Sequence, residues 1–99
     1  MTVQEQCTED GTRVTVHELK CWCEYFEAML DGIKGFELRK DDRGFEVGDE
    51  LWLREWSPIS GDYSGREMRR RVTYVLRGGS FGLEPGFCIL SVVPIEAPS

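Results

Sequence analysis

The sequence predicts an α+β protein that is mainly β: a small, partly closed β-barrel of about five strands, with one helix plugging an end. Most of the chain alternates between apolar and polar residues with a period of two, which is typical of strands with one buried face. Only residues 23–32 have helical spacing. One helix cannot cover both faces of a five-stranded sheet, so we expect the sheet to curl and enclose its own core.

The 99 residues are enough for one domain, which we expect at residues 13–94. Residues 1–12 are polar and acidic and are expected to be flexible, and residues 95–99 are expected to form a frayed tail. No apolar run approaches the roughly 18 residues that span a membrane. The first residues have neither the basic start nor the apolar segment of a signal peptide, so we expect a cytoplasmic protein without membrane contact.

The first half of the domain is expected to contain two strands around the helix. Residues 14–19 mix β-branched side chains with period-two alternation and predict the first strand. In residues 23–32, apolar residues recur at helical spacing until an Asp-Gly pair ends the helix. Residues 34–40 form the second expected strand, and residues 41–49 supply turn residues twice.

Three further strands are expected in the second half. The third strand, residues 50–56, alternates most regularly, and residues 57–65 are a hairpin connection rich in turn formers. Residues 66–77 form the fourth strand, which is polar at its start and apolar later. Residues 78–86 are a glycine-rich loop, and residues 87–95 form the last strand.

The formal net charge of −6 argues against nucleic-acid affinity driven by bulk charge. The distribution of charge is uneven, however. Between positions 34 and 77 there are ten of the twelve basic residues against nine acidic ones, so the middle of the chain is balanced and its ends are acidic. A local basic patch is therefore compatible with this sequence.

The four cysteines are Cys7, Cys21, Cys23 and Cys88. One residue separates the thiols of the Cys-Trp-Cys stretch, whereas zinc knuckles space them by two to four, and no second pair follows. A protein without an export signal keeps its thiols reduced. We therefore expect free thiols, no metal site and no cofactor.

The stretch GIKGFELRK concentrates three charged residues where the helix gives way to the second strand. Alternation places Phe36 and Leu38 on one side and Glu37 and Arg39 on the other, with Lys34 leading into the strand. A solvated ion-pair cluster is one interpretation, although exposed pairs contribute only about 0–1 kcal/mol. The other is a pocket in which the amine or the guanidinium meets a phosphate or a base carbonyl.

Together, the stretches HELK, GIKGFELRK and VGDELWLREW resemble the ASCH domains of the PUA-like superfamily, closest to a small uncharacterised branch in phages and bacteria. The hallmark Gly-x-Lys-x-x-Glu-x-Arg is complete here as Gly32, Lys34, Glu37 and Arg39, and the similarity covers about residues 14–93. The resemblance implies a β-barrel with a cleft beside the helix that binds RNA or a modified nucleotide.

The resemblance also implies an alternative function, because some small ASCH proteins are amidohydrolases that remove an acyl group from acylated cytidine. Lys34 matches their lysine, Glu37 stands where they have a hydroxyl residue, and Glu84 replaces a glutamate on an absent insertion. If this chain is an enzyme, Lys34 and Glu37 are its expected catalytic residues. A phage-encoded interaction protein that sequesters a host factor is a third interpretation, which fits the acidic composition.

Other candidate residues surround the motif. His17 lies on the first strand, and Lys20 follows that strand where the helix begins, near the expected cleft. A lone histidine is more often a packing residue than an acid or base. The third strand and its hairpin offer aromatic rings that either pack or form a platform for a base, and the following arginines either face solvent or contact phosphate. The expected ligand-binding set is Lys34, Glu37, Arg39, His17, Lys20, Arg54, Trp56, Tyr63, Arg69 and Arg71. RNA, DNA or a free nucleoside, and any oligomeric state, remain open.

Overall fold

The computed structural model describes residues 3–7 and 13–95. The described part contains one helix and six strands: β1 (Val3–Cys7), β2 (Arg13–Trp22), α1 (Cys23–Leu30), β3 (Phe36–Lys40), β4 (Glu50–Ser57), β5 (Asp62–Arg77) and β6 (Phe87–Pro94).

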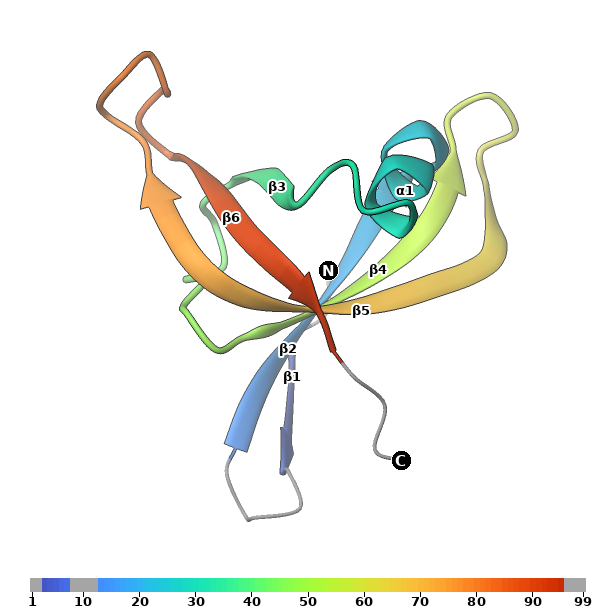
Figure 1. Ribbon diagram of the computed structural model, residues 1–99, viewed down its shortest axis with the longest axis horizontal. Helices are drawn as coiled ribbons and strands as arrows, with labels where there is room; N and C mark the ends of the chain where they lie inside the picture. The colour runs from blue at the N-terminus through green and yellow to red at the C-terminus, as the bar shows by residue number, and fades with distance from the viewer. Residues whose placement is uncertain (1–2, 8–12, 96–99) are drawn as a thin grey trace.

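The strands form a single sheet in the order β1-β2-β4-β5-β6-β3. Strands β2 and β4 are parallel, and every other neighbouring pair is antiparallel. Figure 1 shows the sheet curving into a half-barrel, with the long strand β5 along its base and α1 at its open side. This confirms the predicted mainly β architecture with a partly closed barrel and one short helix.

The core fills the inner face of the half-barrel. Leucines at alternate positions of β4, Leu51 and Leu53, are completely buried, and β6 adds Leu90. The helix covers this face with Phe26 and Met29, which lie three residues apart on one side of α1. The period of two in the strands and the helical spacing in α1 therefore meet in one core.

Strand β1 lies within the segment expected to be flexible, where the sequence predicts no strand. It pairs antiparallel with the first half of β2, from Val3 opposite His17 to Cys7 opposite Arg13. Edge pairing uses main-chain hydrogen bonds, so the segment VQEQC needs no regular apolar stripe to join the sheet. The rest of the expected flexible segment and residues 96–99 of the expected tail lie outside the described residues.

Two strands are longer than expected. Strand β2 continues to Trp22, and β5 begins at Asp62, so the predicted hairpin loop of residues 57–65 is mostly strand. Trp56 pairs with Tyr63, so the β4–β5 ladder extends into the segment that is rich in turn-forming residues. Gly61 has a φ of 73°, a conformation that glycine adopts without strain, and it lies at the turn itself.

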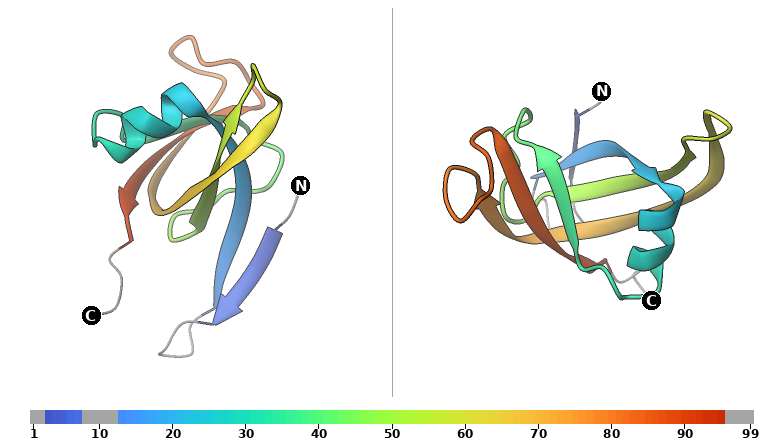
Figure 2. Two further views of the ribbon diagram at one scale, coloured as in Figure 1. Left: turned by 90° about the vertical axis from the view of Figure 1, so that its right-hand side faces the viewer. Right: turned by 90° about the horizontal axis from the view of Figure 1, so that it is seen from above.

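The open side of the half-barrel is bridged by side chains. Strand β1 covers β2 only as far as His17, and beyond it no other described strand pairs with that edge of β2. Arg39 Nη2 donates to the Lys20 carbonyl at 2.6 Å, and Arg43 Nη1 donates to the Glu18 carbonyl at 2.9 Å. In the view from above, β3 crosses the open side between β6 and the end of β2 (Figure 2). Two arginines thus replace the backbone ladder that would close a full barrel.

Candidate functional site

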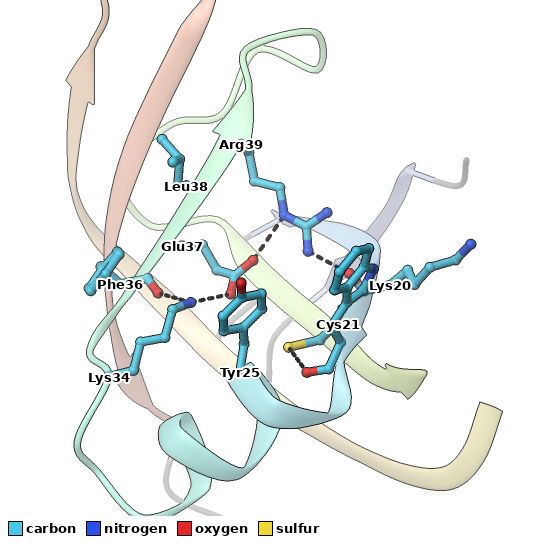
Figure 3. A pocket seen from close by; sticks show the side chains of 9 residues that line it. Lys20, Cys21, Tyr25, Lys34, Phe36, Glu37, Leu38 and Arg39 are labelled. Atoms are coloured by element: carbon cyan, nitrogen blue, oxygen red, sulfur yellow. Dashed lines mark hydrogen bonds and ion pairs between the residues drawn. The ribbon is translucent and has the colours of Figure 1, made fainter. Parts of the chain in front are cut away.

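A pocket of about 480 Å³ lies where this open side meets the start of α1. Ligand pockets for small molecules have volumes of roughly 300–1,000 Å³. The walls come from the end of β2, the first turn of α1 and the segment leading through β3 (Figure 3). The lining residues are Lys20, Cys21, Trp22, Tyr25, Lys34, Phe36, Glu37, Leu38 and Arg39.

The three charged motif residues converge in this pocket. Glu37 is only 4% exposed, and its carboxylate accepts hydrogen bonds from Lys34 Nζ at 3.2 Å and Arg39 Nε at 2.9 Å. Lys34 Nζ also donates to the carbonyl of Phe36 at 2.9 Å. Figure 3 shows the carboxylate between the two cations. The structure thus brings together the residues that the sequence motif links.

The pocket has a surplus of positive charge. Lys34 and Arg39 place two cations in it against a single carboxylate, Glu37, whereas the protein as a whole has a net charge of −6. Burial, and then the negative charge of Glu37, raise the pKa of the Cys21 thiol to about 11, so this lining residue is neutral at pH 7. The Lys20 amine points away from Glu37 (Figure 3) and lies 4.2 Å from the Trp56 ring centroid.

Aromatic rings form the rim of the pocket. Trp22, Tyr25 and Phe36 are each between 44 and 48% exposed. The rings of Trp22 and Tyr25 are inclined by only 15°, with centroids 6.4 Å apart, and Trp22 also contacts Trp56 at 6.3 Å. Lys34 Nζ lies 4.8 Å from the centroid of Phe36 and 5.3 Å from that of Tyr25. Exposed ring faces beside cations are suited to stacking on a planar heterocycle.

An ion-pair cluster anchors α1, which carries Tyr25, to the sheet. Glu55 is buried and accepts hydrogen bonds from Arg66 Nη2 at 2.8 Å and from Ser64 Oγ at 2.6 Å. Arg66 also forms an ion pair with Glu27 of the helix. Hydrogen bonds from Arg66 and Ser64 lower the pKa of the Glu55 carboxyl, so it stays ionised at neutral pH. The helix wall of the pocket is therefore held on the sheet by charged contacts.

His17, which the sequence leaves as either a packing residue or a ligand-binding residue, does not line the pocket. It is completely buried on the inner face, where Nε2 lies 2.8 Å from Asp49 Oδ2 and the ring packs 4.7 Å from Phe45. Alternation along β2 places His17 on the same face as the buried Leu19. The sequence pattern alone does not tell which of the two faces of β2 is the inner one. His17 is a packing residue.

Five of the other predicted residues lie on the outer face of the sheet. Arg54 forms an ion pair with Glu18 at 2.9 Å and lies over Tyr63, 4.1 Å from the ring centroid. Arg69 forms an ion pair with Glu50. Arg71 donates to the carbonyl of Gly48 at 2.9 Å. Of these five residues, Trp56 adjoins the pocket, because its ring contacts Trp22. The other four do not line the pocket: Arg54, Tyr63, Arg69 and Arg71.

The sequence pattern did not indicate the aromatic part of the site. Trp22 ends β2 and Tyr25 lies in the first turn of α1, three residues later, and both line the pocket together with the motif residues. An aromatic pair that flanks a helix start next to HELK is the signal that could have identified them. Cys21 and the two apolar residues of β3 gave no such signal.

The thiols that the structure describes, Cys21, Cys23 and Cys88, are free, as expected, and the side chain of Cys7 lies outside the described residues. No three histidine, cysteine, aspartate or glutamate side chains in the described ranges lie close enough together to hold a metal ion. No helix of residues 13–95 is long and apolar enough to cross a membrane.

Residues 16–92 match the model of a family described as a domain of unknown function, DUF3850. A protein of Escherichia phage P2, described as "Uncharacterized 12.9 kDa protein in GpA 3'region", is 43% identical over 60 residues, which are 61% of this chain and 53% of the relative. The chain thus spans about half the length of this curated relative. Neither description mentions ASCH domains, so that resemblance stays a prediction. Because the family model covers most of its length, the chain belongs to the DUF3850 family.

Proposed function

We propose that this protein is a noncatalytic module that binds RNA, or a modified nucleotide, in the pocket beside α1. One observation carries the proposal: a pocket of nucleotide size has a net positive lining and three exposed aromatic rings in a protein whose net charge is −6. The resemblance to ASCH domains points to the same ligand class. The cytoplasmic location predicted from the sequence is part of this proposal.

Arg39 and Lys34 are the proposed anchors for a phosphate or a base carbonyl. Glu37 orients both, because it accepts from Nε of Arg39 and from Nζ of Lys34. Arg39 donates through Nε and Nη2, so its Nη1 has no hydrogen-bond partner among the described residues and is available to a ligand. A guanidinium held in this way presents its donors at little further entropic cost.

The aromatic rim is the proposed stacking surface for a base. Trp22 and Tyr25 offer near-parallel faces at the mouth, and Trp56 continues the surface away from it. Stacking on aromatic side chains contributes about 1–3 kcal/mol per base and tolerates different base identities. A single strand with one nucleotide in the pocket and its neighbour over Trp22 would use both features.

The contacts favour binding over amide hydrolysis. Lys34 donates to a carboxylate and to a carbonyl, which suits a charged anchor more than a nucleophile. The lining contains no serine or threonine hydroxyl among the described residues. We therefore assign Lys34 and Glu37 to ligand binding and to its orientation.

Titration followed by tryptophan fluorescence tests the proposal, because Trp22 borders the pocket. The probes are a short single-stranded RNA of mixed sequence and, separately, nucleoside 5′-monophosphates with and without base modifications, all at low salt. We expect saturable quenching by at least one probe, and weaker binding as salt rises. The probe that binds more tightly distinguishes a polymer from a free nucleotide.

Lys34→Met and Lys40→Met are a matched pair, since each removes one positive charge and only Lys34 lines the pocket. Loss of a charge-assisted hydrogen bond should weaken binding by about tenfold or more in Lys34→Met. Lys40→Met should change the affinity less than about twofold. If no probe binds, or if the two variants lose affinity equally, the proposal is wrong.

A further inference from the structure

Strand β3 presents its apolar side chains outward. Phe36 and Leu38 are 44 and 54% exposed, whereas Glu37 between them is buried. An antiparallel sheet with one covered face turns its apolar residues inward and its polar residues to water. Apolar residues on the outer side of β3 therefore indicate that this face also has a partner.

The neighbouring strands extend the apolar outer surface. In the register of the sheet, Leu38 lies opposite Ile89 of β6, and Ile89 lies opposite Leu76 of β5. The next row places Phe36 beside Ser91 and Tyr74. We call this surface the β3–β6–β5 face. Its exposed members, between 37 and 61% exposed, are Phe36, Leu38, Tyr74, Leu76, Phe87 and Val93.

The outer surface of the other half of the sheet has a different character. There, arginines are paired with carboxylates, as Arg54 is with Glu18 and Arg69 with Glu50. On the β3–β6–β5 face, none of the described outward positions of β3, of β6 or of residues 74–76 in β5 carries a carboxylate. The cations of this face, Lys40 and Arg71, lie at its margin. The face thus has an apolar centre and a charged margin, as protein interfaces have.

The size of the face suits a modest interface. An aromatic side chain has on the order of 200 Å² of surface, so the exposed fractions of the six residues amount to about 500 Å². Patches of roughly 300–600 Å² on a single chain are often functional. Two such faces in contact would bury about 1,000 Å² in total, which is the lower bound for a specific interface.

We propose that the β3–β6–β5 face is a homodimer interface, in which a second copy of this chain packs on it sheet against sheet. A two-fold interface needs a surface that complements its own image. Strand β6 lies between β3 and β5, so a two-fold axis that runs along β6 over Ile89, between the two sheets, sets Leu38 of one copy against Leu76 of the other. The apolar row of one copy then packs against the apolar row of the other copy, and the cations lie at the margin of the interface.

The dimer also reaches the edge of the pocket. Phe36 and Leu38 belong both to the β3–β6–β5 face and to the pocket lining. A second copy seated on them borders the mouth of the pocket. Dimerisation through this face does not depend on what the pocket binds, because the apolar surface lies on the outer side of the sheet.

Sedimentation equilibrium from micromolar to millimolar protein tests the proposal. The wild-type chain should dimerise, and Leu76→Glu should raise the dimer dissociation constant by at least about tenfold, because it buries a charge in the apolar row. Ile59→Glu is the control, since Ile59 is an exposed apolar residue (96%) in the β4–β5 hairpin and lies off the face. This variant should dimerise like the wild type.

A mixing experiment tests the predicted pairing itself. Leu38→Lys and Leu76→Glu should each be monomeric alone, and their equimolar mixture should associate, because the two-fold axis sets the lysine against the glutamate. Circular dichroism should show that both variants keep the fold, since both positions are exposed. A wild type that stays monomeric at millimolar concentration overturns the proposal. A mixture that does not associate overturns the assigned axis.

Discussion

Strands β4 and β3 alternate with the same period and expose opposite kinds of side chain. In β4, Leu51 and Leu53 are completely buried, while Arg54 is partly exposed on the outer face. In β3, the buried residue is Glu37, and Leu38 is exposed. The period of two is thus a property of the strand, and the choice of face depends on what lies on each side of it.

The position in the sheet explains the difference. Strand β4 lies between β2 and β5 over the core, where only apolar side chains can be buried without partners. Strand β3 is an edge strand at the open side, and its inner face borders the pocket and the end of β2. Glu37 can be buried there because two cations donate to it. The inverted strand is therefore the one that builds the site.

The largest expected effect comes from truncating the same residue type in the two strands. Leu53→Ala should lower the free energy of unfolding by about 2–5 kcal/mol, because it leaves a cavity in the core. Leu38→Ala should change it by less than about 0.5 kcal/mol when it is measured at low protein concentration, where self-association does not contribute. Urea unfolding followed by fluorescence measures both. Equal losses would show that β3 is packed like β4.

A smaller loss is expected when the buried charge of β3 is removed. Glu37→Gln should lower the free energy of unfolding by about 1–3 kcal/mol, because Lys34 and Arg39 keep their charges and lose a shared partner. The matched control is Glu46→Gln, whose exposed carboxylate lies 3.4 Å from Arg77, and there we expect less than about 0.5 kcal/mol. A neutral or stabilising Glu37→Gln would mean that the pair is not needed for folding.

The smallest effect concerns Cys21, whose pKa is raised from 9.0 to about 11 in the folded protein. As the pH rises above about 8, the unfolded thiol ionises first, so the free energy of unfolding should fall, by about 1.4 kcal/mol at pH 10, with almost no effect below about pH 8. The difference in pH dependence between wild type and Cys21→Ala isolates this contribution. If Cys21→Ala keeps the wild-type pH profile, Cys21 ionises normally in the fold.

Alternation and helical spacing were enough to predict the mainly β fold, the single helix and the placement of Glu37 and Arg39 on one side of β3, whereas the expectation that Lys34 joins them in a pocket came mainly from the resemblance to ASCH domains. Strand β1 was not predictable in this way, because its pairing depends on main-chain hydrogen bonds to β2. His17 was misplaced because alternation does not identify the inner face. The aromatic walls depend on how α1 packs against the sheet, which is a long-range property of the fold.

The central claim is that the pocket between α1 and β3 is the binding site. The most direct measurement is a titration of the ¹⁵N-labelled protein with a short single-stranded RNA and with nucleoside 5′-monophosphates, followed by amide chemical shifts. We predict saturable shifts in residues 20–25 and 34–39, and little change in β1 or in the β4–β5 hairpin. Absence of saturable shifts, or shifts confined to the outer face around Arg54 and Arg69, would contradict it.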